Sequence, residues 1–394
     1  MKNGNRLGWK ECKLGEHVLI NSLSIDKNYP YKEIEYLDTG SITNGKIESL
    51  QYLKLDEAPS RAKRIVKDSD IVLSMVRPIQ RHYGYLRNTK PNTVVSTGFV
   101  VLTSKESVDP YFLYSFLTQN DITEYLDVVA EGSTSAYPAF TPDVVENLLI
   151  TLPPLPEQRA IAGVLSSLDD KIDLLHRQNK TLEGMAETLW RKMFVEEADP
   201  GWKKGKLGDF GEFKNGINYS RNENGDNEYS ILNVRDIVEC KYVNAGNFEK
   251  ISINKKKAIP YLLKKGDIVI VRSASPGESL IVLEEIDNLI YSGFSIRLRC
   301  YNKIHSLFLF QFLQSYKKEM DIFSEGTTLK NINQEILNSI ELIIPVEDAA
   351  KEFNERVVSI YNKILLNQGQ IRTLSRTQDI LLPKLMSGEV KVKI

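Results

Sequence analysis

The sequence predicts an α+β protein with an internal twofold repeat, in which two small mixed β-rich domains with short helices alternate with two long helices. Three observations carry this prediction: segments that recur about 193 residues later, short β-branched runs bounded by Gly, Pro and Asn, and two heptad patterns of apolar residues. They divide the chain into a domain at residues 1–150, a helix at 151–200, a domain at 201–342 and a helix at 343–394.

The composition is that of a folded protein in water. The 394 residues exceed what one hydrophobic core usually fills, and 42% hydrophobic with 26% charged residues are ordinary values. No apolar run approaches the roughly 20 residues that span a bilayer, and the N-terminus lacks the apolar core of a signal peptide. We therefore expect a cytoplasmic protein. Three scattered cysteines build neither a disulfide framework nor a zinc-ligand spacing.

The repeat runs through both domains in one unbroken order. Its matched segments are "GWKECKLGE" at 8 with "GWKKGKLGD" at 201, "DIVLS" at 70 with "DIVIV" at 267, "STGFVVL" at 96 with "YSGFSIRL" at 291, "FLYSFL" at 112 with "FLFQFL" at 308, and "EGSTS" at 131 with "EGTTL" at 325. Every shift lies between 193 and 197 residues, so small loop insertions explain the spread. The β-branched segments predict strands, and residues 111–126 and 306–323 predict helices.

The long helices are predicted from apolar residues spaced alternately by four and three, which is a coiled-coil seam. The seam positions are Ile161, Leu165, Leu168, Ile172, Leu175, Asn179, Leu182 and Leu189 in the first helix, and Phe353, Val357, Ile360, Ile364, Ile371 and Leu374 in the second. Asn179, Asn367 and Gln378 interrupt the apolar pattern. Such polar residues either penalise wrong registers or mark a loosely packed layer, and the pattern leaves both interpretations open.

The stretch "LPPLPEQRAI" at 152–161 marks the joint between the first domain and its helix. Pro153 and Pro154 favour extended backbone before them, so they end the domain. Pro156 fits the first turn of a helix, where its missing N–H is not needed, and Glu157 suits the positive helix end.

Motifs for catalysis are missing from the sequence. It holds no GxGxxG after a strand, no GxxxxGK[ST] loop, no GxSxG elbow and no Asx-Pro-Pro-aromatic loop of an adenine methyltransferase. The four histidines show no metal-ligand spacing. We therefore expect no catalytic residue, no metal ligand and no cofactor in this chain.

Positive charge gathers at matching places in the two domains, although the net charge is only -1. Residues 61–90 and residues 250–272 each carry a net charge of +6, around the repeated "DIV" strand. Solvated lysine-rich loops are one interpretation, and phosphate contact is the other. On the second interpretation, Arg77, Arg81 and Arg272 read base edges, because a guanidinium pairs with guanine bidentately. The remaining basic candidates for DNA contact are Arg87, Lys90, Lys264 and Lys265.

The "EGSTSAYPAF" and "EGTTLKNIN" loops place hydroxyls ahead of a short helix. These side chains either donate to phosphates and bases or serve as turn and cap residues. The candidates are Ser133, Thr134, Thr327, Thr328 and Lys330, together with Ser273 beside Arg272. Gly98-Phe99, Gly293-Phe294, Trp9 and Trp202 are expected to be core features instead.

Two divergent domains alternating with two heptad helices, introduced by "LPPLPEQRAIAGVLSSLDDKID" and ending in "LLPKLMSGEV", resemble the specificity subunit of type I restriction-modification systems. The second helix start departs from the pattern, because "IPVEDAAKEF" keeps one proline and has Asp348-Ala349 in place of Glu-Gln. The resemblance implies two target-recognition domains that read a bipartite asymmetric DNA site, spaced by an antiparallel coiled coil. It also implies a non-catalytic subunit that docks methyltransferase and restriction (motor-nuclease) subunits, which would bind S-adenosylmethionine, Mg²⁺ and ATP.

Two other functions compete with this one. A coiled-coil scaffold that recruits proteins without DNA readout would bind DNA no more weakly after Arg77, Arg81 and Arg272 are replaced by alanine. A stand-alone nuclease or methyltransferase would be active as an isolated chain with a metal or a methyl donor.

Overall fold

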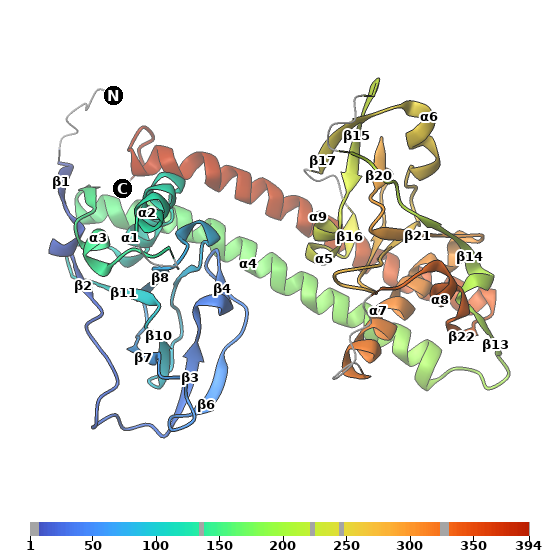
Figure 1. Cartoon of the computed structure of the whole chain (residues 1–394), viewed down its shortest axis with the longest axis horizontal. Helices are drawn as coiled ribbons and strands as arrows, with labels where there is room; N and C mark the ends of the chain where they lie inside the picture. The colour runs from blue at the N-terminus through green and yellow to red at the C-terminus, as the bar shows by residue number, and fades with distance from the viewer. Residues whose placement is uncertain (1–7, 134–137, 221–224, 244–247, 324–330, 394) are drawn as a thin grey trace. The chain divides into compact units, whose positions relative to one another are not determined.

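The computed structural model describes residues 8–133, 138–220, 225–243, 248–323 and 331–393. The chain forms two compact units, Met1–Ile172 with Leu374–Ile394, and Asp173–Thr373. Each unit holds one β-rich domain and one part of each long helix (Figure 1). The predicted α+β repeat is confirmed, whereas the boundaries at residues 150, 200 and 342 stay predictions. No helix among the described residues is long and apolar enough to cross a membrane.

Among its described residues, the first domain contains two four-stranded sheets and two short two-stranded ones. The sheets have the strand orders β2-β11-β8-β9, β6-β3-β10-β7, β1-β12 and β4-β5. The strands are β1 Lys10–Lys13, β2 Val18–Ile20, β3 Glu33–Leu37, β4 Ile42–Thr43, β5 Lys46–Ile47, β6 Gln51–Lys54, β7 Ala62–Ile65, β8 Ile71–Ser74, β9 Tyr83–Tyr85, β10 Thr93–Ser96, β11 Phe99–Ser104 and β12 Leu149–Leu152. The helices are α1 Pro110–Leu117, α2 Asn120–Glu131 and α3 Pro142–Glu146. They gather at one end of the domain, away from β3 and β6 (Figure 1).

In the part of the second domain that the structure describes, there are a five-stranded, a three-stranded and a two-stranded sheet. Their strand orders are β14-β21-β18-β19-β16, β17-β15-β20 and β13-β22. The strands are β13 Lys203–Lys206, β14 Gly211–Asn215, β15 Asn227–Leu232, β16 Tyr242–Val243, β17 Glu249–Ile253, β18 Ile268–Val271, β19 Ser279–Val282, β20 Leu289–Tyr291, β21 Ser295–Cys300 and β22 Glu341–Ile344. The helices are α5 Val234–Glu239, α6 Lys255–Ala258, α7 Ser306–Phe323 and α8 Gln334–Ser339.

The two domains share one strand pairing scheme. The pairs β8–β11 and β18–β21 are antiparallel, and the pairs β3–β10 and β15–β20 are parallel. Ser74 lies opposite Phe99 in the first domain, and Val271 lies opposite Ser295 in the second. In strand register, the shift from β11 to β21 is therefore 196 residues, one more than the shift between the matched Gly-Phe pairs of the sequence repeat.

A buried aspartate begins the central strand of each domain. Asp70 Oδ2 accepts from the Lys67 amide at 2.9 Å, and Asp267 Oδ2 accepts from the Lys264 amide at 2.8 Å. The other oxygen of Asp70 accepts from Thr103 Oγ1 at 2.6 Å, while Asp267 receives the Arg299 guanidinium at 2.6 and 2.7 Å. Thr103 and Arg299 are 196 residues apart, so these contacts support the register given by the strand pairs.

The central strands are buried on both faces, as their continuous apolar sequence predicts. Ile71 and Leu73 of β8 pack toward the helices, and Val72 packs toward the second sheet. In the second domain, Ile268 and Ile270 pack toward the helices and Val269 toward the other sheet. Each domain is therefore layered as helices, sheet and sheet.

The long helices are α4, Leu155–Arg191, and α9, Glu347–Met386. Every predicted seam position is buried or half-buried. Within the second unit, Asn367 Nδ2 of α9 donates to Asn179 Oδ1 of α4 at 2.9 Å, and the rings of Phe353 and Phe194 lie 5.4 Å apart. Asn179 of α4 thus contacts Asn367 of α9, and Phe194, in the helical turn that follows α4, contacts Phe353 near the start of α9. The residue numbers rise along one helix as they fall along the other, as in antiparallel helices. The asparagine pair favours the register interpretation over a loosely packed layer.

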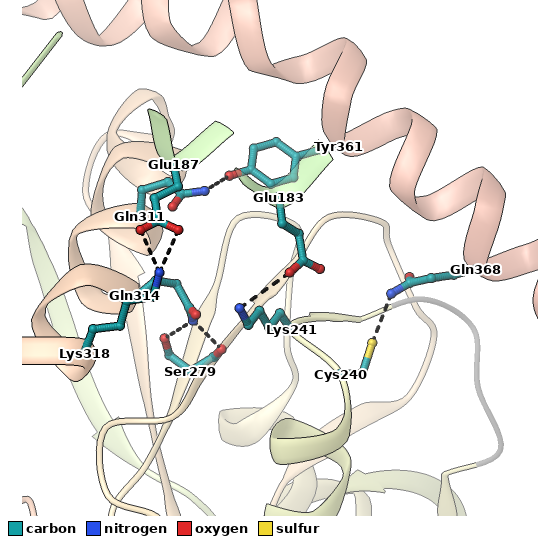
Figure 2. A network of polar contacts seen from close by, with 10 residues as sticks. All are labelled: Glu183, Glu187, Cys240, Lys241, Ser279, Gln311, Gln314, Lys318, Tyr361 and Gln368. Atoms are coloured by element: carbon teal, nitrogen blue, oxygen red, sulfur yellow. Dashed lines mark hydrogen bonds and ion pairs between the residues drawn. The ribbon is translucent and has the colours of Figure 1, made fainter. Parts of the chain in front are cut away.

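Polar contacts attach the second domain to the two long helices (Figure 2). From α4, Glu187 pairs with Lys318 of α7 at 2.6 Å and Glu183 pairs with Lys241 at 3.5 Å. From α9, the Tyr361 hydroxyl accepts from Gln311 Nε2 at 2.6 Å. Hydrogen bonds restrict orientation more than apolar contacts do, so we infer that this network fixes the domain on its helices.

The start of α4 is held by a buried glutamine. Gln158 is only 2% exposed. Its Oε1 accepts from the Asp109 amide at 2.9 Å, and its Nε2 donates to the Pro153 carbonyl at 2.9 Å and the Ser107 carbonyl at 3.3 Å. The Gln of "LPPLPEQ" therefore joins the first domain to its helix.

The start of α9 is attached to the second domain by a different residue. When the ends of β12 and β22 are aligned, Ala349 and Ala350 occupy the positions of Glu157 and Gln158. The sequence prediction that Asp348 and Ala349 replace the Glu-Gln pair was therefore wrong by one residue. Asn354, one turn later, donates to the Ile304 carbonyl at 2.7 Å. At the shift of 196 residues Ile304 is the counterpart of Val108, the neighbour of Ser107, so an amide side chain binds adjacent backbone positions in the two domains.

Replacing Gln158 by alanine is expected to lower the free energy of unfolding of the first unit by about 3 kcal/mol, because a buried amide and two carbonyls lose their partner. Hydrogen exchange of the full chain in urea, followed in peptides from the first unit, measures this loss of stability. Arg159→Ala, on the exposed side of the same turn, is the matched control. Equal exchange rates in the two variants would contradict this role.

Candidate nucleic-acid interface

In the first domain, the candidate arginines stand on the turn after β8. Arg77 and Arg81 flank a 3-10 turn at Pro78–Gln80, and both have left-handed backbone, with φ of 47° and 57°. Residues other than glycine adopt this conformation at a cost of about 1 kcal/mol or more, so the surrounding structure must hold it. Arg77 is exposed, and Arg81 donates from Nη2 to Asn120 Oδ1 at 2.9 Å.

The hydroxyl loop lies directly beside this turn. Val76 and Ala139 form an isolated β-bridge, and the Arg77 amide donates to the Pro138 carbonyl at 3.1 Å. Ser133 Oγ accepts a hydrogen bond from the Ala139 amide at 3.4 Å, which is what a residue that stabilises a turn does. The structure therefore brings Arg77 and Ser133 together, although 56 residues separate them in sequence. Thr134 lies outside the described residues.

The second domain repeats the arrangement. Ser273 forms a β-bridge with Asn331, and the Ile332 amide donates to the Arg272 carbonyl at 2.8 Å. The strand end after β18 and the chain after the second hydroxyl loop are thus side by side. Thr327, Thr328 and Lys330 lie outside the described residues.

The two turns differ in the side chains that they present. Ala274, with φ of 70°, is the counterpart of Arg77 at the shift of 197 residues that relates β8 to β18. Arg272 is the counterpart of Met75. Equivalent backbone positions therefore carry unlike side chains, which suits two unlike ligand sequences.

Arg87 and Lys90 have partners within the first unit. The Arg87 guanidinium pairs with Asp170 of α4 and lies 5.3 Å from the ring centres of Tyr85 and Tyr111. The Lys90 ammonium pairs with Glu35, and this hydrogen bond raises the pKa of Lys90. Acidic residues outside 61–90 thus offset part of its positive charge. Phosphate contact by Arg87 and Lys90 stays a prediction that competes with these pairs.

Lys264 and Lys265 lie at the other end of the central strand. Both side chains are exposed in the turn before β18, whereas Arg272 follows the strand. Four residues of strand separate these ends by about 13 Å. The candidates therefore form two sets, a turn-and-loop set with Arg77, Arg81, Ser133, Arg272 and Ser273, and a second set with Arg87, Lys90, Lys264 and Lys265.

The matched Gly-Phe pairs have opposite environments. Phe99 is completely buried, as expected, but Phe294 is 64% exposed, so its assignment to the core was wrong. In strand register Phe294 is the counterpart of Gly98, and a slip of one residue along a strand moves a side chain to the other face. Trp9 and Trp202 are half-buried at the edges of their cores.

Phe294 borders a cavity that the sequence did not predict. The cavity has a volume of about 420 Å³. It is lined by Ile217, Asn218, Tyr219, Asn233, Glu249, Ser292, Gly293 and Phe294. Within the described residues, no group of three or more His, Cys, Asp or Glu side chains is placed to hold a metal ion.

Comparison with known proteins gives a consistent result for both halves of the chain. The family described as type I restriction modification DNA specificity domain matches residues 7–184 and again residues 200–376. The type I restriction enzyme HindI specificity subunit of Haemophilus influenzae is 24% identical over 97% of this chain and 99% of its own length. The MjaIX specificity subunit of Methanocaldococcus jannaschii is 27% identical over 84% of this chain and 79% of its own length.

A solved structure shares the fold. The crystal structure of the S subunit of a type-I restriction-modification system from M. genitalium aligns with a TM-score of 0.58 at 17% identity, over 98% of both chains. The repeated domain match spans nearly the whole chain, so this protein belongs to the family of type I restriction modification DNA specificity domains and carries two copies of the domain.

Proposed function

We propose that this chain is the DNA-specificity subunit of a type I restriction-modification complex and reads a bipartite, asymmetric site, one half-site per domain. The observation that carries the proposal is the repeated family match together with the turn-and-loop set, which recurs at the same strand end in each domain. Arginines next to hydroxyl and amide groups suit base edges and phosphates.

The half-sites are proposed to differ in sequence. The first domain presents Arg77 and Arg81 on its turn, and the second presents Arg272 and Ser273. A guanidinium in another place meets another base pair, so equivalent backbones can read unlike sequences.

The long helices are proposed to form an antiparallel coiled coil that sets the distance between the half-sites. The 37 residues of α4 correspond to about 56 Å of helix. Two domains held by such a spacer bind one duplex together when their separation fits whole turns, about 34 to 36 Å each.

The subunit itself is proposed to be non-catalytic. It would direct methylation by methyltransferase subunits and cleavage by restriction subunits, which would supply S-adenosylmethionine, Mg²⁺ and ATP. The missing catalytic motifs of the sequence support this division of labour.

A salt titration tests the proposal. The chain, assembled with its methyltransferase subunits, is expected to bind its site with an affinity that falls about a thousandfold or more between 50 and 200 mM salt, as for about six neutralised phosphates. A duplex of scrambled sequence is expected to bind more weakly at every salt concentration. An affinity that depends on neither salt concentration nor DNA sequence would contradict the proposal and favour the coiled-coil scaffold without DNA readout.

A further inference from the structure

The strongest unexplained feature of the second domain is an exposed aromatic ring beside the turn-and-loop set. Phe294 is 64% exposed, while most large apolar side chains of this domain are buried. Its carbonyl accepts a hydrogen bond from the Arg272 amide at 3.0 Å. The ring therefore belongs to a residue that is directly hydrogen-bonded to the candidate base-reading arginine.

The cavity at Phe294 combines apolar and polar groups. Ser292 lines the cavity, is 1% exposed, and its Oγ has no hydrogen-bond partner among the described residues. A buried hydroxyl without a partner is costly, so the fold keeps an unsatisfied polar group beside this cavity. The cavity volume of about 420 Å³ falls within the roughly 300 to 1,000 Å³ of typical ligand pockets.

The backbone at the cavity permits little change. A Cβ atom at Gly216 would lie 2.1 Å from the backbone carbonyl oxygen of Ser292, so only glycine fits there. This close approach fixes the strand next to Phe294. Phe294 lies in the turn between β20 and β21, and an exposed ring on a fixed turn loses little entropy when it binds a flat partner.

We propose that Phe294 is a specificity-determining residue of the second domain, which contacts a base of the second half-site through its ring. This inference rests on the proposed function and adds a contact that charge patterns do not reveal. Aromatic rings bind bases through their faces or by apolar contact, without ion pairs. The first domain has Gly98 at the same point of its sheet, so it lacks this contact.

The test compares Phe294→Ala with Tyr301→Ala in the full chain assembled with its methyltransferase subunits. Phe294 precedes β21 directly and Tyr301 follows it directly, and Tyr301 is 75% exposed, so it controls for the loss of an exposed ring next to the same strand. Base preference at each position is measured by binding selection from randomised duplexes. Thermal unfolding verifies that both variants fold.

In Phe294→Ala we expect discrimination at one position of the second half-site to fall about tenfold, as for the loss of one base contact. The first half-site and Tyr301→Ala are expected to match the wild type. Discrimination within twofold of the wild type at every position, or a uniform loss for all sequences, would overturn the proposal. Failure of the proposed function would be separate, because the wild-type chain would then show no sequence preference.

Discussion

Replacing Arg272 by alanine is expected to reduce discrimination at one base pair of the second half-site by about 10- to 100-fold, and Arg77→Ala is expected to do the same in the first half-site. Each bidentate guanidinium–guanine contact is worth about 1 to 3 kcal/mol of discrimination. Arg77 and Arg272 belong to different units, so each substitution is expected to leave the other half-site unchanged.

Lysine substitutions separate base reading from phosphate contact. Arg272→Lys keeps the positive charge but not the planar guanidinium. Compared with Arg272→Ala, it should therefore restore affinity for phosphate but not the discrimination between base pairs. Lys265→Ala, at the other end of β18, is expected to weaken all sequences equally and to reduce the salt slope by about 1. Recovery of full discrimination in Arg272→Lys would contradict base reading. The measurement is binding to duplexes that differ at single positions.

Inserting seven residues into each long helix is expected to lengthen the spacer between the half-sites by about 3 base pairs, because seven helical residues add about 10.5 Å. The insertions belong after Leu175 in α4 and before Ile371 in α9. There they keep the Asn179–Asn367 pair of the second unit and the hydrogen bond from Gln378 to Asp169 in the first. Whole heptads also preserve the seam.

An insertion in α4 alone is the control. It shifts the seam of one helix relative to the other, places asparagines against apolar residues, and should abolish specific binding. Sequence selection from duplexes with variable spacers measures both variants. If the paired insertion keeps the original spacer, the helices do not set the distance.

Much of the fold is readable from the sequence. The repeated "DIV" segments predict the two buried central strands because their apolar residues are continuous. The heptad pattern predicts the long helices, and the proline cluster predicts where α4 begins. These signals are local, so no knowledge of strand partners is needed.

The rest depends on contacts between distant residues. The alignment of Gly98-Phe99 with Gly293-Phe294 is correct as a match of letters, yet the strand register differs by one residue and reverses the burial of the phenylalanine. The charge count around Lys90 omits Glu35, which lies 55 residues earlier. Strand pairing and ion pairing are tertiary properties, so sequence spacing alone does not give them.

An exchange of domains tests the central claim most directly. The chain with residues 1–150 replaced by the first domain of another specificity subunit, assembled with its methyltransferase subunits, is compared with the wild type by mapping methylated sites in a host genome. One half-site should change to that of the donor, while the other half-site and the spacer stay the same. Two changed half-sites, or an unchanged site, would contradict a separate DNA-reading role for each domain.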